Sequence, residues 1–275
     1  MIVIELEIEM IKLSLEEIKK VQIEILDEID ECCKENNINY WLDSGTLLGA
    51  IRHKGYIPWD DDIDIGMLRE DYDRFIHIFN EYEKSHKKLR FDCVEINDKC
   101  FFPYGKVFNE RTVLYEAGIT MAINVDVFVY DTAPSSTLAC KYMYFWRDIY
   151  TSLNRRQRNM GGESPKISRR LIGRMIAPVL QCFPIGFFCK RIIKNSKRYN
   201  KKTGYIGNFT SVTKIKANRN WVSKCIKMPF EGKMYNVPNN YDEWLKEFYG
   251  DYMKLPEKDK RIPKHNIVAY LKDEM

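Results

Sequence analysis

A cluster of four aspartates inside a β-prone segment restricts the fold of this chain more than any other feature: residues 59–65 read WDDDIDI. A strand over Asp60–Met67 would place the side chains of Asp60, Asp62 and Asp64 on one face. Carboxylates spaced about 7 Å apart repel one another unless a cation lies between them. Mg²⁺ or Mn²⁺ meets this need, because both ions prefer oxygen ligands and bind phosphate oxygens. The simpler alternative is a solvated acidic turn.

A further aspartate, Asp126, is the only acidic residue in the apolar segment 123–129, which reads INVDVFV. An unpaired charge in a buried strand would cost several kcal/mol, so Asp126 needs a partner. We expect it to share the metal with Asp62 and Asp64 or to act as a general base. A buried hydrogen-bond acceptor is the alternative role, and Asp131 is the weaker candidate residue.

The turn Ser44-Gly45-Thr46 lies between a β-prone run at 38–42 and a helix-like segment at 46–53. Backbone N–H groups at a helix N-terminus bind phosphate readily, and the two hydroxyls add donors. Such turns are also common helix caps, so the motif alone is weak. Its position, 16 residues ahead of Asp60, allows a phosphate and a metal to meet.

Hydrophobic periodicity predicts alternating elements along the chain. Ser14 and Glu17 form a capping box, which starts a helix over 14–35. We expect further helices at 46–53, 69–85 and 241–249, strands at 38–42, 60–67, 89–96, 102–108, 112–116 and 123–130, and a hairpin within 228–237. The alternation over residues 2–9 indicates a strand or a local start and not a signal peptide.

These elements predict an α/β (α+β) fold, with a mixed sheet flanked by helices. We expect a catalytic core over 1–136. A mainly helical, basic region over 137–275 would complete the site with its C-terminal end. The chain has 275 residues, of which 45% are hydrophobic, and this excludes a peptide hormone, a coiled coil and a disordered tail.

Charge is unevenly distributed, with 15 basic against 28 acidic residues over 1–140 and 16 against 2 over 141–204. The acidic part suits a cation, and the basic part suits an anionic surface. Within the basic part, the apolar stretch 175–189 is too short and too broken by prolines to span a bilayer. It would either rest on an anionic membrane face or pack on the core as a helical hairpin.

The eight cysteines show no Cys-x-x-Cys pair, so we interpret them as reduced residues of a cytosolic protein.

The segment 41–65, WLDSGTLLGAIRHKGYIPWDDDIDI, closely resembles the signature of the LicD family of phosphocholine transferases, to which the fukutin-related ribitol-phosphate transferases are also similar. The resemblance extends to Pro103–Val107, Asp126–Phe128, Phe230–Lys233, Tyr249–Met253, Arg261 and His265. It implies a nucleotidyltransferase-like sheet and transfer of a phospho-alcohol, commonly phosphocholine, from a CDP-activated donor to a hydroxyl of a bacterial cell-surface glycan. CMP would be released. The donor alcohol is open between choline, ribitol and glycerol.

The resemblance also implies roles for single residues. Asp62 and Asp64 match the metal-binding pair, Asp60 is an outer ligand, and Asp126 is the third acid and the candidate base. The substrate-binding candidates are Ser44, Gly45 and Thr46 for phosphate or ribose, Arg52 and Lys106 for phosphate charge, and Arg261 and His265 near the donor.

Two other functions remain open at this stage. A nucleotidyltransferase would use the same acids but release pyrophosphate. A nucleic-acid-binding module built on the basic segment with Tyr142, Tyr144, Phe145 and Trp146 is the less favoured alternative, and we expect no nucleic-acid partner. We expect a cytoplasmic location, with the inner face of the plasma membrane and a lipid-linked acceptor as a further alternative.

Overall fold

The computed structural model describes residues 10–116, 118–158, 176, 178–199, 203–263 and 266–272. The expected N-terminal strand or local start over residues 2–9 lies outside the described residues, and so does the candidate residue His265.

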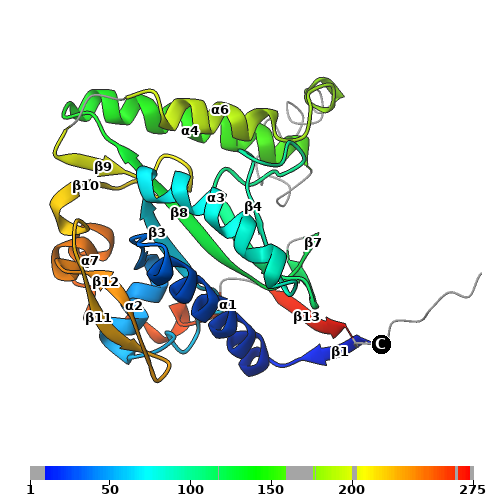
Figure 1. The fold of residues 1–275 in the computed structure, drawn as a ribbon. Coiled ribbons are helices and arrows are strands. Elements are labelled where there is room, and N and C mark those ends of the chain that lie inside the picture. Colours follow the sequence, from blue (N-terminus) through cyan, green and yellow to red (C-terminus); the bar gives the residue numbers. More distant parts are fainter. Residues whose placement is uncertain are drawn as a thin grey trace, which may run out of the picture.

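The described chain forms a mixed α+β fold, as the sequence predicts (Figure 1). The helices are α1 (Leu15–Glu35), α2 (Ser44–His53), α3 (Arg69–Ser85), α4 (Thr137–Gln157), α6 (Phe187–Ser196) and α7 (Tyr241–Tyr249), with 3-10 turns at Arg219–Trp221 and Lys258–Lys260. The strands are β1 (Met10–Leu13), β2 (Trp41–Leu42), β3 (Asp64–Leu68), β4 (Leu89–Asp92), β5 (Gly105–Asn109), β6 (Thr112–Glu116), β7 (Ile119–Met121), β8 (Asn124–Thr132), β9 (Tyr205–Gly207), β10 (Lys216–Asn218), β11 (Cys225–Phe230), β12 (Lys233–Pro238) and β13 (Ile267–Lys272).

The longest strand, β8, is the centre of a seven-stranded mixed sheet. One edge of β8 pairs in parallel with β3, and β2 follows beyond β3. The other edge pairs antiparallel with β5 through the first half of β8 and with β9 at its end. The side chains of Val125, Val127 and Val129 are fully buried. Their hydrophobicity and branched shape suit a strand enclosed in the core.

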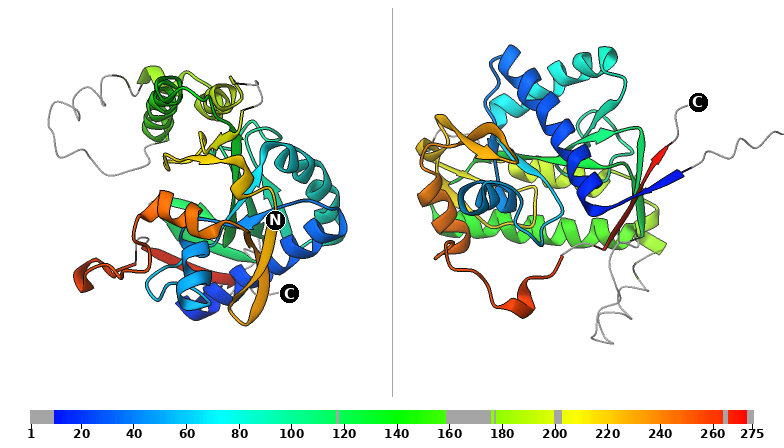
Figure 2. Two further views of the ribbon diagram at one scale, coloured as in Figure 1. Left: turned by 90° about the vertical axis from the view of Figure 1, so that its left-hand side faces the viewer. Right: turned by 90° about the horizontal axis from the view of Figure 1, so that it is seen from below.

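Helices α1 and α3 cover one face of this sheet, whereas α4 and α6 lie side by side in a separate layer (Figures 1 and 2). The capping box of Ser14 and Glu17 starts α1, as predicted. A second sheet has the strand order β1-β13-β6-β7, so the two ends of the chain meet there. The predicted helices over 14–35, 69–85 and 241–249 are confirmed, each to within one residue.

The predicted strand over 60–67 is wrong in its first half. Strand β3 begins at Asp64, and residues 60–63 form an irregular segment. The regular ladder of β3 with β8 begins at Asp64, and that with β2 covers only Ile65 and Gly66, so residues 60–63 precede the part of the chain that pairs in the sheet. Asp60, Asp62 and Asp64 therefore do not form a row on one face of a strand.

The basic region contributes α4 and α6, but it is not entirely helical. Strands β9 and β10 extend the central sheet, and β13 completes the second one. The boundary after residue 136 stays a prediction. Among the described residues, no helix combines the length and the apolar character needed to cross a membrane.

The competing candidate Asp131 has a structural partner. At the end of β8, its carboxylate accepts hydrogen bonds from Nε (2.8 Å) and Nη2 (2.9 Å) of Arg69, the first residue of α3. Asp131 is 3% exposed, and Arg69 also contacts Glu95 at 3.3 Å. Although burial of Arg69 opposes its charge, the hydrogen bonds that it donates to Asp131 and the nearby negative charges outweigh this effect and raise the pKa of Arg69. The pair ties α3 to the central strand.

Replacing Arg69 by methionine should lower the free energy of unfolding by about 3–5 kcal/mol, because it leaves the buried Asp131 carboxylate without its cation. Urea denaturation followed by circular dichroism measures this loss. The control is Lys84→Met, which removes an exposed ion pair with Glu81 and should cost less than about 1 kcal/mol. Equal stabilities of the two variants would contradict the structural role of Arg69.

Candidate functional site

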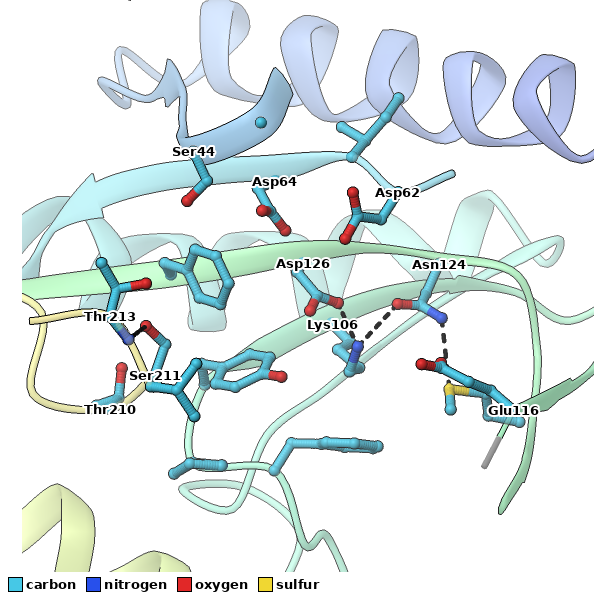
Figure 3. A pocket seen from close by; sticks show the side chains of 18 of the residues that line it. Ser44, Asp62, Asp64, Lys106, Glu116, Asn124, Asp126, Thr210, Ser211 and Thr213 are labelled. Carbon is cyan, nitrogen blue, oxygen red and sulfur yellow. Dashed lines mark hydrogen bonds and ion pairs between the residues drawn. The ribbon is translucent and has the colours of Figure 1, made fainter. Parts of the chain in front are cut away.

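Three neighbouring strands bring a lysine and two aspartates side by side. The register places Lys106 of β5 opposite Asp126 of β8, and Asp126 opposite Asp64 of β3. Opposed residues direct their side chains to the same face of a sheet, and all three side chains point into one space (Figure 3). Lys106 forms an ion pair with Asp126, and its Nζ donates to Oδ1 of Asn124 at 3.0 Å. The predicted partner of Asp126 is thus a lysine within the sheet.

Negative charge is concentrated around Asp64, which is 9% exposed. Burial raises the pKa of the Asp64 carboxyl well above its usual range, and the charges of Asp62, Asp126 and Asp43 raise it further. Only Lys106 acts in the opposite direction among the main contributors. This arrangement favours any added positive charge.

The irregular segment before β3 gathers three more carboxylates. One oxygen from each of Asp60, Asp61 and Asp62 lies within 4.8 Å of the others. A regular strand would have directed the side chain of Asp61 away from those of Asp60 and Asp62. Because the backbone is irregular here, Asp61 lies with them. Carboxylate oxygens are the ligands that Mg²⁺ and Mn²⁺ prefer, so the donor set fits the predicted type of ion.

The start of α2 lies directly against this cluster. A Cβ atom at Gly45 would come within 2.4 Å of Oδ2 of Asp60, so only glycine allows the present approach. Ser44 has a φ of +48°, a left-handed backbone conformation that is rare outside glycine and is often found at functional sites. Thr46 does not line the cavity, and its Oγ1 accepts a hydrogen bond from the backbone N–H of Asp64 at 2.9 Å, so its contact with substrate stays a prediction.

A chain of hydrogen bonds holds the acidic segment in place. Glu231, at the tip of the β11–β12 hairpin, accepts from the backbone N–H of Tyr56 at 2.9 Å. The Tyr56 hydroxyl donates to Oε1 of Gln22 at 2.9 Å, and Nε2 of Gln22 donates to the carbonyl of Asp61 at 3.0 Å. Gln22 is 5% exposed on α1. Sequence reasoning did not assign a role to Gln22, although it is the one polar residue on an apolar helical face.

The acidic cluster, the first residues of α2, Lys106 and Gln22 line a single cavity of about 710 Å³. Of the predicted residues, Ser44, Gly45, Asp60, Asp62, Asp64, Lys106 and Asp126 line it. The lining residues that sequence reasoning missed include Gln22, Asn124, the aromatic residues Phe101, Phe102 and Phe248, the α4 residues Thr151, Asn154 and Arg155, and the segment Thr210–Thr213. No local pattern marks most of these residues, because they come from separate parts of the chain.

The two predicted arginines do not line this cavity. Arg52 donates from Nη1 to the carbonyl of Tyr252 at 2.7 Å, and Arg261 donates from Nε to the carbonyl of Pro256 at 2.8 Å. Burial lowers the pKa of Arg52, and the positive charge of Arg261 lowers it further. The predicted contact of the two arginines with a donor stays a prediction.

Comparison with known proteins assigns the chain to a family. Residues 37–153 match the family described as LicD/FKTN/FKRP, nucleotidyltransferase domain. The chain is 31% identical over 267 residues to the lipopolysaccharide cholinephosphotransferase LicD of Haemophilus influenzae, covering 94% of this chain and 99% of that protein. It is 56% identical over 34 residues to the human ribitol 5-phosphate transferase FKRP, covering 12% of this chain and 7% of that protein.

The mixed sheet, the converging carboxylates and these matches define a transferase of the phosphocholine and ribitol-phosphate class. Within that class the chain belongs to the LicD family, as its sequence motifs indicate.

Replacing Gln22 by leucine should loosen the acidic segment, because the Asp61 carbonyl and the Tyr56 hydroxyl each lose their hydrogen bond with Gln22. We expect backbone amides within residues 57–63 to exchange with deuterium about tenfold faster, as measured by mass spectrometry. The control is Glu24→Leu on the exposed side of the same helix, with unchanged exchange in that segment. Unchanged exchange in Gln22→Leu as well would show that the hydrogen-bond chain does not hold the loop.

Proposed function

We propose that the cavity binds a CDP-activated alcohol with Mg²⁺ or Mn²⁺ and transfers the phospho-alcohol to a glycan hydroxyl, releasing CMP. The observation that carries the proposal is the convergence of Asp62, Asp64 and Asp126 beside the start of α2 and Lys106. A pyrophosphate donor needs cations to neutralise its charge, a group to hold the phosphate and a base near the attacking hydroxyl. The cavity offers groups suited to each task.

The residues of the cavity divide these tasks. Asp62 and Asp64 would hold the metal with Asp60 and Asp61 around them, and the bound ion would supply charge neutralisation at the transferred phosphoryl. The backbone N–H groups at Ser44 and Gly45 hold a phosphate oxygen. Lys106 fixes the Asp126 carboxylate through their ion pair.

Asp126 would serve as the general base. The acceptor oxygen attacks the phosphorus that carries the alcohol, and the hydroxyl proton passes to the Asp126 carboxylate. The bond from this phosphorus to the bridging oxygen breaks, and CMP leaves with the electron pair. The ion pair with Lys106 keeps the carboxylate oriented toward the cavity.

We favour phosphocholine as the transferred group. Nζ of Lys106 lies 4.8 Å from the ring centroid of Phe102 and 5.5 Å from that of Tyr104, so aromatic faces already attract a cation on this wall. A quaternary ammonium group is recognised by the same interaction. The relative that this chain matches over most of its length is a lipopolysaccharide cholinephosphotransferase, which supports a glycan acceptor.

CDP-choline with Mn²⁺ should raise the melting temperature of the wild-type protein by about 5–10 °C at a donor concentration near 100 times Kd. Asp62→Asn and Asp64→Asn should lose this rise, because each removes a carboxylate beside the metal. Asp98→Asn is the matched control, since Asp98 is 83% exposed and does not line the cavity.

Product analysis then separates the two reaction types. Release of CMP from CDP-choline in the presence of a lipopolysaccharide acceptor supports the proposal. Stabilisation by CTP alone, with release of pyrophosphate, would instead identify a nucleotidyltransferase.

The basic helical layer supports a further part of this proposal, contact with an anionic membrane that carries the acceptor. Leu138, Tyr142 and Phe145 form an exposed row on α4, with exposed fractions of 78%, 49% and 57%. The guanidinium of Arg198, which follows α6, lies 5.4 Å from the ring centroid of Tyr142 in this row. Exposed apolar side chains with cations beside them suit the surface of anionic lipids.

Flotation with vesicles of phosphatidylglycerol at low salt should carry the wild-type protein to the top of the gradient, and replacing Leu138 and Phe145 by serine should reduce the bound fraction at least threefold. Met253→Ser, which changes an equally exposed residue elsewhere, should bind like the wild type. Failure of the wild-type protein to float at low salt would exclude this membrane contact.

A further inference from the structure

The segment Thr210–Thr213, between β9 and β10, is held rigidly at the edge of the cavity. Oδ1 of Asn208 accepts hydrogen bonds from the backbone N–H of Thr210 (3.1 Å) and of Ser211 (2.9 Å), and also from the Thr210 hydroxyl (3.1 Å). Arg147 of α4, 1% exposed, donates to the carbonyls of Ser211 and Thr213. A buried asparagine and a buried arginine thus fix the backbone of a short surface segment.

This anchoring presents hydroxyl groups to the cavity. Ser211 and Thr213 both line it, and Figure 3 shows their side chains on the side opposite Ser44 and Asp64. Oγ of Ser211 accepts from the backbone N–H of Thr213 at 3.4 Å, which leaves its own proton for another acceptor.

The neighbouring wall of the cavity is one side of α4. Thr151, Asn154 and Arg155 lie three and four residues apart and line the same cavity. Asn154 is 6% exposed, and its Nδ2 donates to the carbonyl of Phe101 at 3.0 Å. Among the described residues, its Oδ1 has no hydrogen-bond partner. A buried acceptor without a partner costs free energy, which a donor on a bound ligand recovers.

These two walls differ in chemistry from the aspartate end of the cavity. They contribute hydroxyls, an amide oxygen and a guanidinium, and neither segment contributes a carboxylate. Groups that both donate and accept suit a ligand with several hydroxyls, whereas a metal ion or a quaternary ammonium requires anions or aromatic faces.

We propose that Ser211, Thr213 and Asn154 form a subsite for the vicinal hydroxyls of a sugar ring. The inference rests on the proposed function, because that reaction brings two such rings to the cavity: the ribose of the nucleotide and the acceptor sugar. Arg147 and Asn208 are positioning residues, which act through the backbone of the segment.

The chain provides a matched control for Asn154. Asn195 of α6 is 2% exposed, its Nδ2 donates to a backbone carbonyl at 2.9 Å, and its Oδ1 also lacks a partner in the described chain. Asn195 does not line the cavity. Asn154→Leu and Asn195→Leu should therefore destabilise the protein similarly, and only Asn154→Leu should affect ligand binding.

The first arm of the test measures the affinities for CMP and 2′-deoxy-CMP by calorimetry with Mn²⁺. If the ring is the ribose, the wild-type protein and Asn195→Leu should bind CMP about tenfold more tightly than 2′-deoxy-CMP. Asn154→Leu and Thr213→Val should lose this preference.

The second arm measures binding of a panel of methyl hexosides by saturation-transfer NMR, without nucleotide or metal. If the ring is the acceptor sugar, wild-type protein and Asn195→Leu should give signals that Asn154→Leu and Thr213→Val reduce at least threefold. A subsite is supported when either arm depends on Asn154. It is overturned when the variants match the wild-type protein in both arms. Because the hexoside arm needs neither metal nor nucleotide, a wild-type protein that binds no CMP would contradict the proposed function and would still leave the subsite tested.

Discussion

The surrounding structure has to accommodate the repulsion between two carboxylates on buried parallel strands, Asp64 on β3 and Asp126 on β8. The strand register keeps both side chains on the same face of the sheet, so neither can move away from the other. Lys106 on the next strand offsets part of the repulsion through its ion pair with Asp126. Asp64 retains a raised pKa, caused first by burial and then by the charges of Asp62 and Asp126. A fold that keeps such a concentration of negative charge gives up stability for a site whose electrostatics favour added positive charge.

Elements from the far end of the chain hold this site together. The tip of the β11–β12 hairpin reaches Asp61 through Glu231, Tyr56 and Gln22, over more than 150 residues of sequence. The segment that faces the carboxylates across the cavity, Thr210–Thr213, also follows the basic helices. The acidic core and the later part of the chain therefore build one cavity together, and local sequence patterns describe only one side of it.

This division explains what the sequence predicted and what it did not. The capping box and the regular apolar spacing determine α1 locally, and the isolated aspartate in an apolar segment correctly marked Asp126 as a residue with a buried partner. The strand over residues 60–67 was half wrong, because a strand extends only as far as its pairing, and the ladder of β3 with β8 begins at Asp64. Gln22 and Asn154 were missed for the same reason. Each is an ordinary polar residue on a helix, and only contacts with distant segments give it a role.

The start of α2 shows how a buried hydrogen-bond network prepares a binding surface. Asp43 occupies the N-cap position, where aspartate usually accepts from the first-turn amides, but its side chain makes no such cap. Its carboxylate instead accepts from the Tyr130 hydroxyl at 2.5 Å and from Nε1 of Trp244 at 3.1 Å, which joins α2 to the central strand and to α7. These two donors hold the Asp43 carboxylate away from the amides of the first helical turn. The carboxylate therefore does not cap the positive end of the helix dipole, which faces the cavity beside Gly45. The same interaction that anchors α7 in the core thus leaves the helix terminus suited to an anion next to the acidic cluster, which is the pairing of charges that a metal-bound phosphate requires.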